Sequence, residues 1–227
     1  MNPIKKHRRV NTEIFSKKVL IKRKIVNVIT KFSFATKAGM NSNNPHKQNQ
    51  DAFVTQPHIM GLPHCHLFAV CDGHGSKGRE VSNLLKVRLP QLIEKNFNLQ
   101  MQGPALNLQS YPPIGKVSTA LNAAFLQANN ELSKMGSEVV RFSGSTCVSI
   151  MTYGRHLYIA NLGDSRAIII SENPDNKLHG VAKALTRDHK PEDPLEAVNI
   201  INAGGRIDSY RDENGRKLGP ERVWLKN

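Results

Sequence analysis

One run of nine residues, 67–75, constrains this chain more than any other part of its sequence. The first five are apolar and are bounded by turn-forming residues, a pattern typical of a buried β-strand. Asp72, Gly73, His74 and Gly75 follow directly, so the strand delivers a carboxylate and an imidazole to one point. The glycines let the backbone bend there and bring main-chain oxygens close to a ligand.

Two interpretations of this turn are open from these residues alone. The first is an ordinary strand-to-loop turn, in which Asp, Gly and His are all common. The second is a metal site, because carboxylates are preferred ligands of hard cations such as Mg²⁺ and Mn²⁺. Asp51, Asp72 and Asp164 all stand at predicted strand ends or turns. Clustered carboxylates repel one another unless a cation neutralises them, so their convergence at one sheet edge would favour the metal site.

The order of the predicted elements favours antiparallel sheets with segregated helices, because no regular βαβ alternation is present. Apolar periodicity predicts strands over 32–36, 51–55, 67–71, 145–152, 156–161 and 165–171, and helices over 78–97, 115–135 and 192–203. Tight turns between the last three strands predict an antiparallel meander. Pro90 is expected to kink the first helix or split it in two.

Composition indicates a globular protein, with 39% apolar and 22% charged residues among 227. No stretch approaches the roughly 18 uninterrupted apolar residues of a membrane span, so we expect no transmembrane segment. Lysines interrupt every apolar run near the N-terminus, so we expect no secretory signal. Cys65, Cys71 and Cys147 form no CxxC pair, which predicts buried, reduced thiols in a cytoplasmic or nuclear protein.

The net charge of +14 is concentrated near the N-terminus. Residues 1–50 hold twelve Lys and Arg and one acidic residue, whereas the other positions hold twenty basic and seventeen acidic residues. We therefore predict a basic extension over residues 1–30, forming an amphipathic helix or an added strand. It could contact an acidic partner or an anionic membrane surface, act in nuclear import, or be a solvated tail docked on the domain. The nearly balanced body does not predict specific nucleic-acid binding.

Five motifs occur in a fixed order: NQDAF (49–53), FAVCDGHG (68–75), SGSTCVSI (143–150), ANLGDSRAII (160–169) and LTRDHKPEDPLEAVNIINAGGRI (185–207). In order and spacing they resemble the metal-dependent serine/threonine protein phosphatases of type 2C, the PPM family. The resemblance implies that residues 31–227 form a partial phosphatase domain. It also implies an α+β fold, in which two antiparallel β-sheets pack as a sandwich with helices on both outer faces.

The resemblance implies hydrolysis of phosphoserine and phosphothreonine in proteins by a metal-activated water. Asp72 would bridge two Mg²⁺ or Mn²⁺ ions, the main-chain oxygen of Gly73 would coordinate one of them, and Asp51 would join the site largely through metal-bound water. Asp164 matches an aspartate linked to a weaker third metal. His74 would be the general acid that protonates the leaving Ser or Thr alkoxide.

The chain departs from the family pattern in two respects. Many members have a glutamate where this chain has Gln50, and an upstream arginine that grips the substrate phosphate. Here His46 and Lys47 are the nearest cations, and we predict that they bind substrate phosphate. The family also continues beyond residue 227 into strands that carry two later metal-binding aspartates, so we expect a sandwich that is incomplete at its C-terminus. Asp208 and Asp212 are predicted to lie in a loop and not to replace them.

Three hypotheses for function follow from these features. The first is a metal-dependent protein phosphatase, and the second is a catalytically inactive pseudophosphatase that binds phosphoproteins or regulates an active enzyme, because the C-terminal metal ligands are absent. The third is binding to an anionic surface or to nucleic acid through residues 1–31. We interpret the other motif residues as structural, with Thr146 and Gly163 supporting turns and the pair Asp188 and His189 capping or bracing the helix that follows.

Overall fold

The computed structural model describes residues 11–15, 25–40, 42, 45–101, 111–136, 139, 141–173 and 179–225. The chain divides into two compact units, one of residues Arg9–Thr186 and one that includes Arg187–Asn227. Most of the predicted basic extension, residues 1–10 and 16–24, lies outside the described residues. Among the described residues, no helix combines the length and apolar character needed to cross a membrane.

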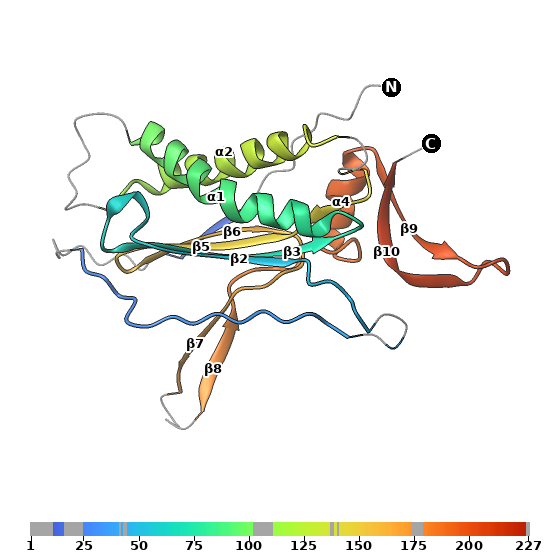
Figure 1. Ribbon diagram of the computed structural model, residues 1–227, viewed down its shortest axis with the longest axis horizontal. Coiled ribbons are helices and arrows are strands. Elements are labelled where there is room, and N and C mark those ends of the chain that lie inside the picture. Colours follow the sequence, from blue (N-terminus) through green and yellow to red (C-terminus); the bar gives the residue numbers. More distant parts are fainter. Residues whose placement is uncertain are drawn as a thin grey trace. The chain divides into compact units, whose positions relative to one another are not determined.

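A six-stranded antiparallel sheet forms the centre of the larger unit (Figure 1). Its strands are β1 (Asn11–Phe15), β2 (Asp51–Pro57), β3 (Cys65–His74), β4 (Gly144–Ser145), β5 (Cys147–Tyr153) and β6 (His156–Leu162). They lie in the order β1-β6-β5-β3-β2, and β4 pairs with the end of β3. The predicted strands of NQDAF and FAVCDGHG are thereby confirmed, as is the hairpin of β5 and β6. For residues 11–15, the structure has the added strand, one of the two alternatives for the extension.

Two long helices, α1 (Gly78–Gln100) and α2 (Ile114–Leu132), cover one face of this sheet (Figure 1). Alternate residues of β3 point into the core between sheet and helices, because side chains alternate between the two faces of a strand. The core includes Leu67, Ile93 and Leu121, all at most 1% exposed. Both predicted helices are confirmed. The predicted split at Pro90 is wrong, because α1 continues through this residue as one helix.

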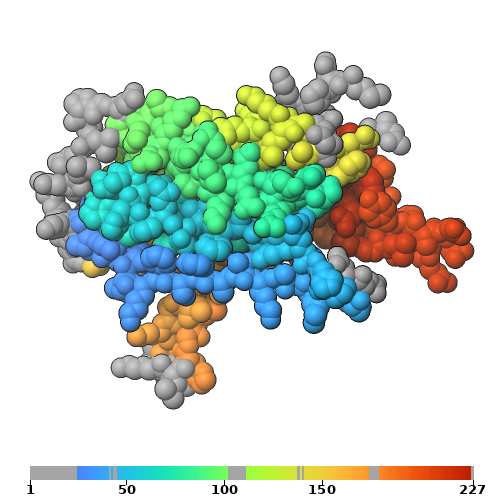
Figure 2. Space-filling model, viewed as in Figure 1, coloured from blue at the N-terminus to red at the C-terminus, as the bar shows by residue number. Residues whose placement is uncertain are grey.

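The predicted strand over residues 32–36 is wrong. Residues 25–40 have no regular secondary structure, and Figure 2 shows this segment as a blue strip along the body of its unit. The alternating phenylalanines pack their rings onto the sheet: Phe32 lies 5.4 Å from Phe68, and Phe34 lies 4.4 Å from Phe53, between ring centroids. The alternation therefore reflects ring packing, while the segment forms no strand ladder.

The predicted three-strand meander holds for only two of its strands. Strand β7 (Ile168–Glu172) pairs with β8 (Gly180–Ala184) in a separate two-stranded sheet and not with β6. Ala167 accepts a hydrogen bond from Leu185 N and donates one to Thr186 Oγ1, so the chain before β7 is joined to the chain after β8. Figure 2 shows this orange hairpin projecting from the rest of its unit.

The smaller unit contains helix α4 (Pro194–Asn202) and a hairpin of β9 (Gly205–Arg211) and β10 (Lys217–Leu225). The helix confirms the prediction for 192–203. Its N-cap is Asp193, whose Oδ1 accepts hydrogen bonds from Leu195 N at 2.9 Å and Glu196 N at 3.2 Å. The predicted cap by Asp188 or His189 is therefore wrong. Bracing by these two residues stays a prediction; their neighbour Arg187 contacts the cap, with its Nε 3.4 Å from Asp193 Oδ2.

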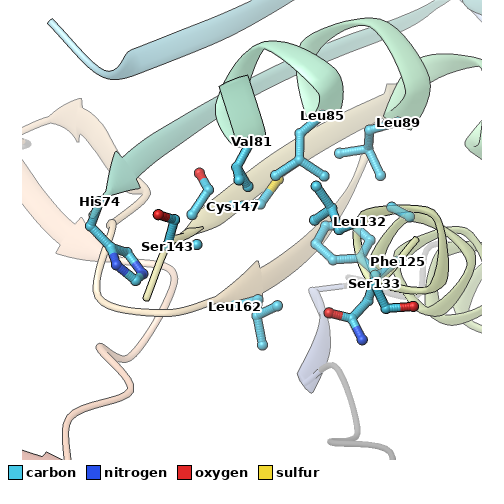
Figure 3. Close-up of a pocket in the computed structure, with 14 residues that line it drawn as sticks. His74, Val81, Leu85, Leu89, Phe125, Leu132, Ser133, Ser143, Cys147 and Leu162 are labelled. Carbon is cyan, nitrogen blue, oxygen red and sulfur yellow. The ribbon is translucent and has the colours of Figure 1, made fainter. Parts of the chain in front are cut away.

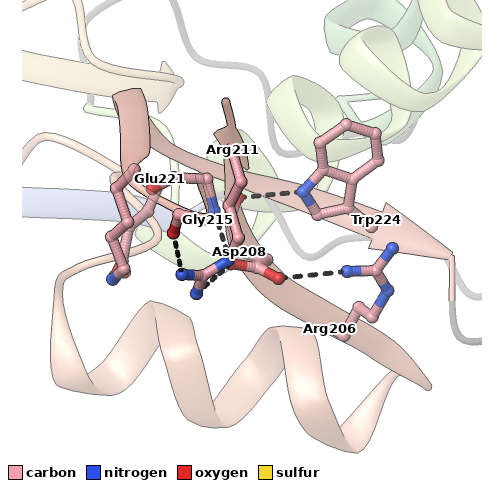
Figure 4. Close-up of polar contacts among 8 residues, drawn as sticks. Arg206, Asp208, Arg211, Gly215, Glu221 and Trp224 are labelled. Carbon is pink, nitrogen blue, oxygen red and sulfur yellow. Dashed lines mark hydrogen bonds and ion pairs between the residues drawn. The ribbon is translucent and has the colours of Figure 1, made fainter. Parts of the chain in front are cut away.

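Asp208 lies within β9, so the predicted loop is wrong at this position. Its carboxylate lies 3.6 Å from Arg206 and 3.4 Å from Arg211, and its main-chain oxygen accepts from Trp224 Nε1 at 2.9 Å (Figure 4). A backbone hydrogen bond from Ser209 is the main cause that lowers the pKa of Asp208, and the two arginines add to it. This carboxylate is therefore paired with arginines within its own hairpin.

The predicted α+β class with antiparallel sheets is confirmed. The described residues form one main sheet of six strands and two separate two-stranded sheets, and the second large sheet of the predicted sandwich is not among them. The predicted placement of helices on both outer faces is not seen in the larger unit, because α1 and α2 share one face of the main sheet (Figure 1). The predicted free thiols are confirmed, since all three cysteines are buried and unbridged.

Candidate metal centre

The register of β2 and β3 places two of the predicted carboxylates side by side. Asp51 begins β2 and is the direct cross-strand partner of Asp72 near the end of β3. Directly opposed residues have Cβ atoms about 4.5–5.5 Å apart and share one face of the sheet. Burial, followed by the charges of Asp51 and Asp164, raises the pKa of Asp72. The structure therefore brings Asp51 and Asp164 each within electrostatic reach of Asp72.

The chemistry of this cluster suits a hard cation. Within the described part of the chain, no lysine or arginine forms an ion pair with Asp51, Asp72 or Asp164. Carboxylate and main-chain oxygens are the donors that Mg²⁺ and Mn²⁺ prefer. The described residues contain no group of three or more His, Cys, Asp or Glu side chains with the geometry of a metal site. The ligand set present is thus of the right type but partial.

The turn after Asp72 needs glycine at two positions. Gly73 N donates to Gln50 O at 3.2 Å, and a Cβ on Gly73 would lie 2.5 Å from that oxygen. Gly75 has φ of 86°, in the left-handed region where other residues are strained. Between them, His74 is exposed, and its imidazole lies against Gly144, where an added Cβ would be 2.9 Å from Nε2. The close backbone approach therefore depends on these glycines.

Two hydroxyl groups that the sequence reasoning did not assign to the site join its parts. Asp72 N donates to Thr146 Oγ1 at 3.0 Å, and Thr146 N donates to Asp72 O at 2.9 Å. Thr146 Oγ1 also lies 2.6 Å from Ser165 Oγ. Ser165 follows Asp164, so this chain of contacts links the end of β3 to the turn that carries the third carboxylate. The threonine of the GST motif (144–146) and the serine of the GDSR motif (163–166) were the features of the sequence that could have predicted these contacts.

The predicted substrate-binding cations are not brought into this cluster by any described contact. His46 and Lys47 are exposed in the segment that leads into β2. The side chain of Lys47 runs past Gly39, whose ideal Cβ position lies 3.9 Å from Lys47 Nζ. Their role in phosphate binding stays a prediction.

A pocket of about 240 Å³ lies beside His74 (Figure 3). Its walls are mainly apolar side chains of α1, α2 and the adjacent strands, among them Val81, Leu85, Phe125 and Leu162. Ser143 stands near His74 at one end of this pocket. The pocket forms a concave surface beside the exposed imidazole, and its lining residues include no further carboxylate.

Comparisons with known proteins agree with this geometry. The model of the family "Protein phosphatase 2C" matches residues 36–220. "Probable protein phosphatase 2C 35" from Arabidopsis thaliana is 28% identical over 211 residues, which cover 86% of this chain and 55% of that protein. "Probable protein phosphatase 2C 72" from the same plant is 35% identical over 162 residues, covering 71% and 46%.

A solved structure shares the fold. The crystal structure of serine-threonine phosphatase 2C from Toxoplasma gondii aligns with a TM-score of 0.55 and 25% identity, over 78% of this chain and 56% of that one. The chain spans about half the length of the curated relatives it matches. The family match covers well over half of the chain and includes Asp51, Asp72, His74 and Asp164. The chain therefore belongs to the protein phosphatase 2C family.

Proposed function

We propose that this chain takes part in metal-dependent hydrolysis of phosphoserine and phosphothreonine in proteins. The observation that carries the proposal is the register pair Asp51 and Asp72 next to an exposed imidazole, His74; burial, followed by the charge of Asp51, raises the pKa of Asp72. Membership of the family supports phosphatase chemistry.

The residues present suit this reaction in distinct roles. Asp72 and Asp51, with the main-chain oxygen of Gly73, would hold Mg²⁺ or Mn²⁺, and Asp164 would belong to a weaker third site. Two such ions, when bound, supply an activated water and neutralise phosphoryl charge. His74 would give a proton from an imidazole nitrogen to the departing alkoxide, a role that its exposed position suits. His46 and Lys47 would attract the phosphate as point charges.

The proposed partners are phosphorylated proteins, with an acidic partner or anionic surface proposed for residues 1–30 on the basis of their charge. We place the protein in the cytoplasm or nucleus, a proposal that its three buried, unbridged cysteines support. A fluorescent fusion of the chain, imaged in cells, would test this location.

The test of activity is Mn²⁺-dependent release of phosphate from a phosphothreonine peptide by the purified chain. Asp72→Asn should abolish turnover, and His74→Ala should lower kcat by about 10²–10⁴, the usual contribution of a general acid. Glu192→Gln, which removes an exposed carboxylate of the smaller unit, is the control and should match the parent. No turnover by the parent at saturating Mn²⁺ would refute the proposal for this chain. Phosphopeptide binding without turnover would instead favour the pseudophosphatase.

A further inference from the structure

Gln50 occupies the position where the family resemblance leads one to expect glutamate, yet its side chain faces the turn. Its Nε2 donates a hydrogen bond to Gly75 O at 2.7 Å. Its main-chain oxygen accepts from Gly73 N at 3.2 Å and from Ser82 Oγ at 2.6 Å. Gln50 thus contacts both glycines of the Gly73–Gly75 turn. Through Ser82 it also contacts the beginning of α1.

The contact with the carbonyl of Gly75 requires a hydrogen-bond donor, which the Gln50 amide supplies. A carboxylate is acceptor-only when ionised, so glutamate at this position would place a negative oxygen against the carbonyl of Gly75. The carboxamide is also closely surrounded, because an added Cβ on Gly78 would lie 3.1 Å from Gln50 Oε1 and 3.2 Å from Gln50 Cδ. The amide therefore fills the space between Gly75 and Gly78 in an orientation that its donor group determines.

We propose that Gln50 is a positioning residue, which fixes the turn carrying Asp72 and His74 through its amide, and that it does not substitute for a metal-binding glutamate. On its other side the chain just after this turn is held by Ser143, whose Oγ accepts from Lys77 N at 3.0 Å. With both sides held, the Asp72 carboxylate and the His74 imidazole have defined positions relative to Asp51. This inference rests on the proposed function, because the groups that Gln50 positions are its metal-binding and acid groups.

The experiment compares two replacements with opposite chemistry. Gln50→Met keeps the length of the side chain but removes the donor, and Gln50→Glu exchanges the donor for a carboxylate. Gln48→Met, two residues earlier in an exposed position, is the matched control. Two quantities are measured: amide hydrogen exchange of residues 73–78 by mass spectrometry, and Mn²⁺ affinity from the electron paramagnetic resonance signal of free Mn²⁺. The midpoint of thermal unfolding shows whether a variant is destabilised as a whole.

A positioning role predicts that both variants act in the same direction. Each should speed exchange of residues 73–78 and weaken Mn²⁺ binding by about three- to tenfold, the range for loss of one hydrogen bond, while the control matches the parent. Tighter Mn²⁺ binding by Gln50→Glu, with weaker binding by Gln50→Met, would show that position 50 acts as a ligand and would overturn the inference. Unchanged Mn²⁺ affinity in both variants would overturn it as well.

The exchange measurement separates this inference from the proposed function. If the parent binds no Mn²⁺, the proposed metal-dependent activity fails, while faster exchange in both variants still supports the amide contact. Unchanged exchange in both variants overturns the contact, whatever the parent does with Mn²⁺.

Discussion

Replacing Asp72 with asparagine is expected to stabilise the metal-free chain while removing its response to Mn²⁺. Asp72 and Asp51 are direct partners in the register of β2 and β3, so their Cβ atoms are about 5 Å apart. At that distance two unit charges repel by about 1 kcal/mol at the dielectric constant of water and by about 3 kcal/mol at an effective value of 20. Both side chains are exposed, so the lower figure applies, and we expect a gain of about 1 kcal/mol.

The pH dependence of stability gives a second measure of the same effect. Burial and the neighbouring carboxylates raise the pKa of Asp72 above its ordinary value of 3.8, so the folded carboxyl keeps its proton at pH values where the unfolded one has lost it. The free energy of unfolding therefore falls as the pH rises from 3.8 through the raised pKa. Asp72→Asn should remove this fall and leave the rest of the pH profile unchanged.

The assay is urea denaturation of the parent and of Asp72→Asn, without metal and over a series of Mn²⁺ concentrations. In the parent, Mn²⁺ that binds only the folded chain should raise the free energy of unfolding with the logarithm of its concentration. Without metal, the free energy of unfolding of Asp72→Asn should be about 1 kcal/mol higher than that of the parent, and added Mn²⁺ should change it little. Glu192→Gln removes one negative charge in the smaller unit. It should neither stabilise the metal-free chain nor weaken its response to Mn²⁺. A metal-free Asp72→Asn that is less stable than the parent would refute the argument from like charges.

Two further predictions concern the supports of the site and the core beneath it. Thr146→Val removes the hydroxyl that accepts from Asp72 N and contacts Ser165, and should lower the free energy of unfolding by about 1 kcal/mol. Thr146→Ser keeps the hydroxyl and should stay within about 0.5 kcal/mol of the parent. Equal urea midpoints for Thr146→Val and the parent would show that this contact contributes nothing. Ile93→Ala opens a cavity where no surface is exposed and should cost about 2–5 kcal/mol. Leu99→Ala, on the exposed side of the same helix, should cost about 0.5 kcal/mol or less, and similar losses for both would contradict the assigned core.

The sequence predicted the elements whose signal is local. Strands β2, β3, β5 and β6 and all three described helices follow apolar patterns that a single segment carries. The segment over residues 32–36 also alternates, but its rings pack on Phe68 and Phe53 on the face of the sheet opposite α1 and α2. A period of two shows that alternate side chains share one face of the segment, and here Phe32 and Phe34 stay 49% and 60% exposed. It does not show whether the backbone pairs with a neighbour. The same limit explains β7, whose apolar residues indicate a strand but not that its partner is β8.

The residues of the site that escaped prediction are those that act across large separations in sequence. Gln50 and Gly75 are 25 residues apart, and Thr146 and Asp72 are 74 apart. Each contact is a hydrogen bond between a polar side chain and the backbone of another element, which leaves no periodic pattern. Charge and motif order identified the three aspartates as candidates, because carboxylates that converge repel one another unless a cation neutralises them. An amide or hydroxyl side chain at the same place is compatible with any turn, so its presence predicts no particular contact.

The paired carboxylates and the core depend on one and the same register. In β2 and β3 the residues that pack against the helices are Ala52, Val54, Leu67, Ala69 and Cys71. Their alternation leaves Asp51 and Asp72 directly opposed on the other face. A slip of one residue would turn every apolar side chain of a strand to the wrong face, and would also separate the two carboxylates. Burial of the core therefore holds two like charges together, and this repulsion is the energy that a bound cation would relieve.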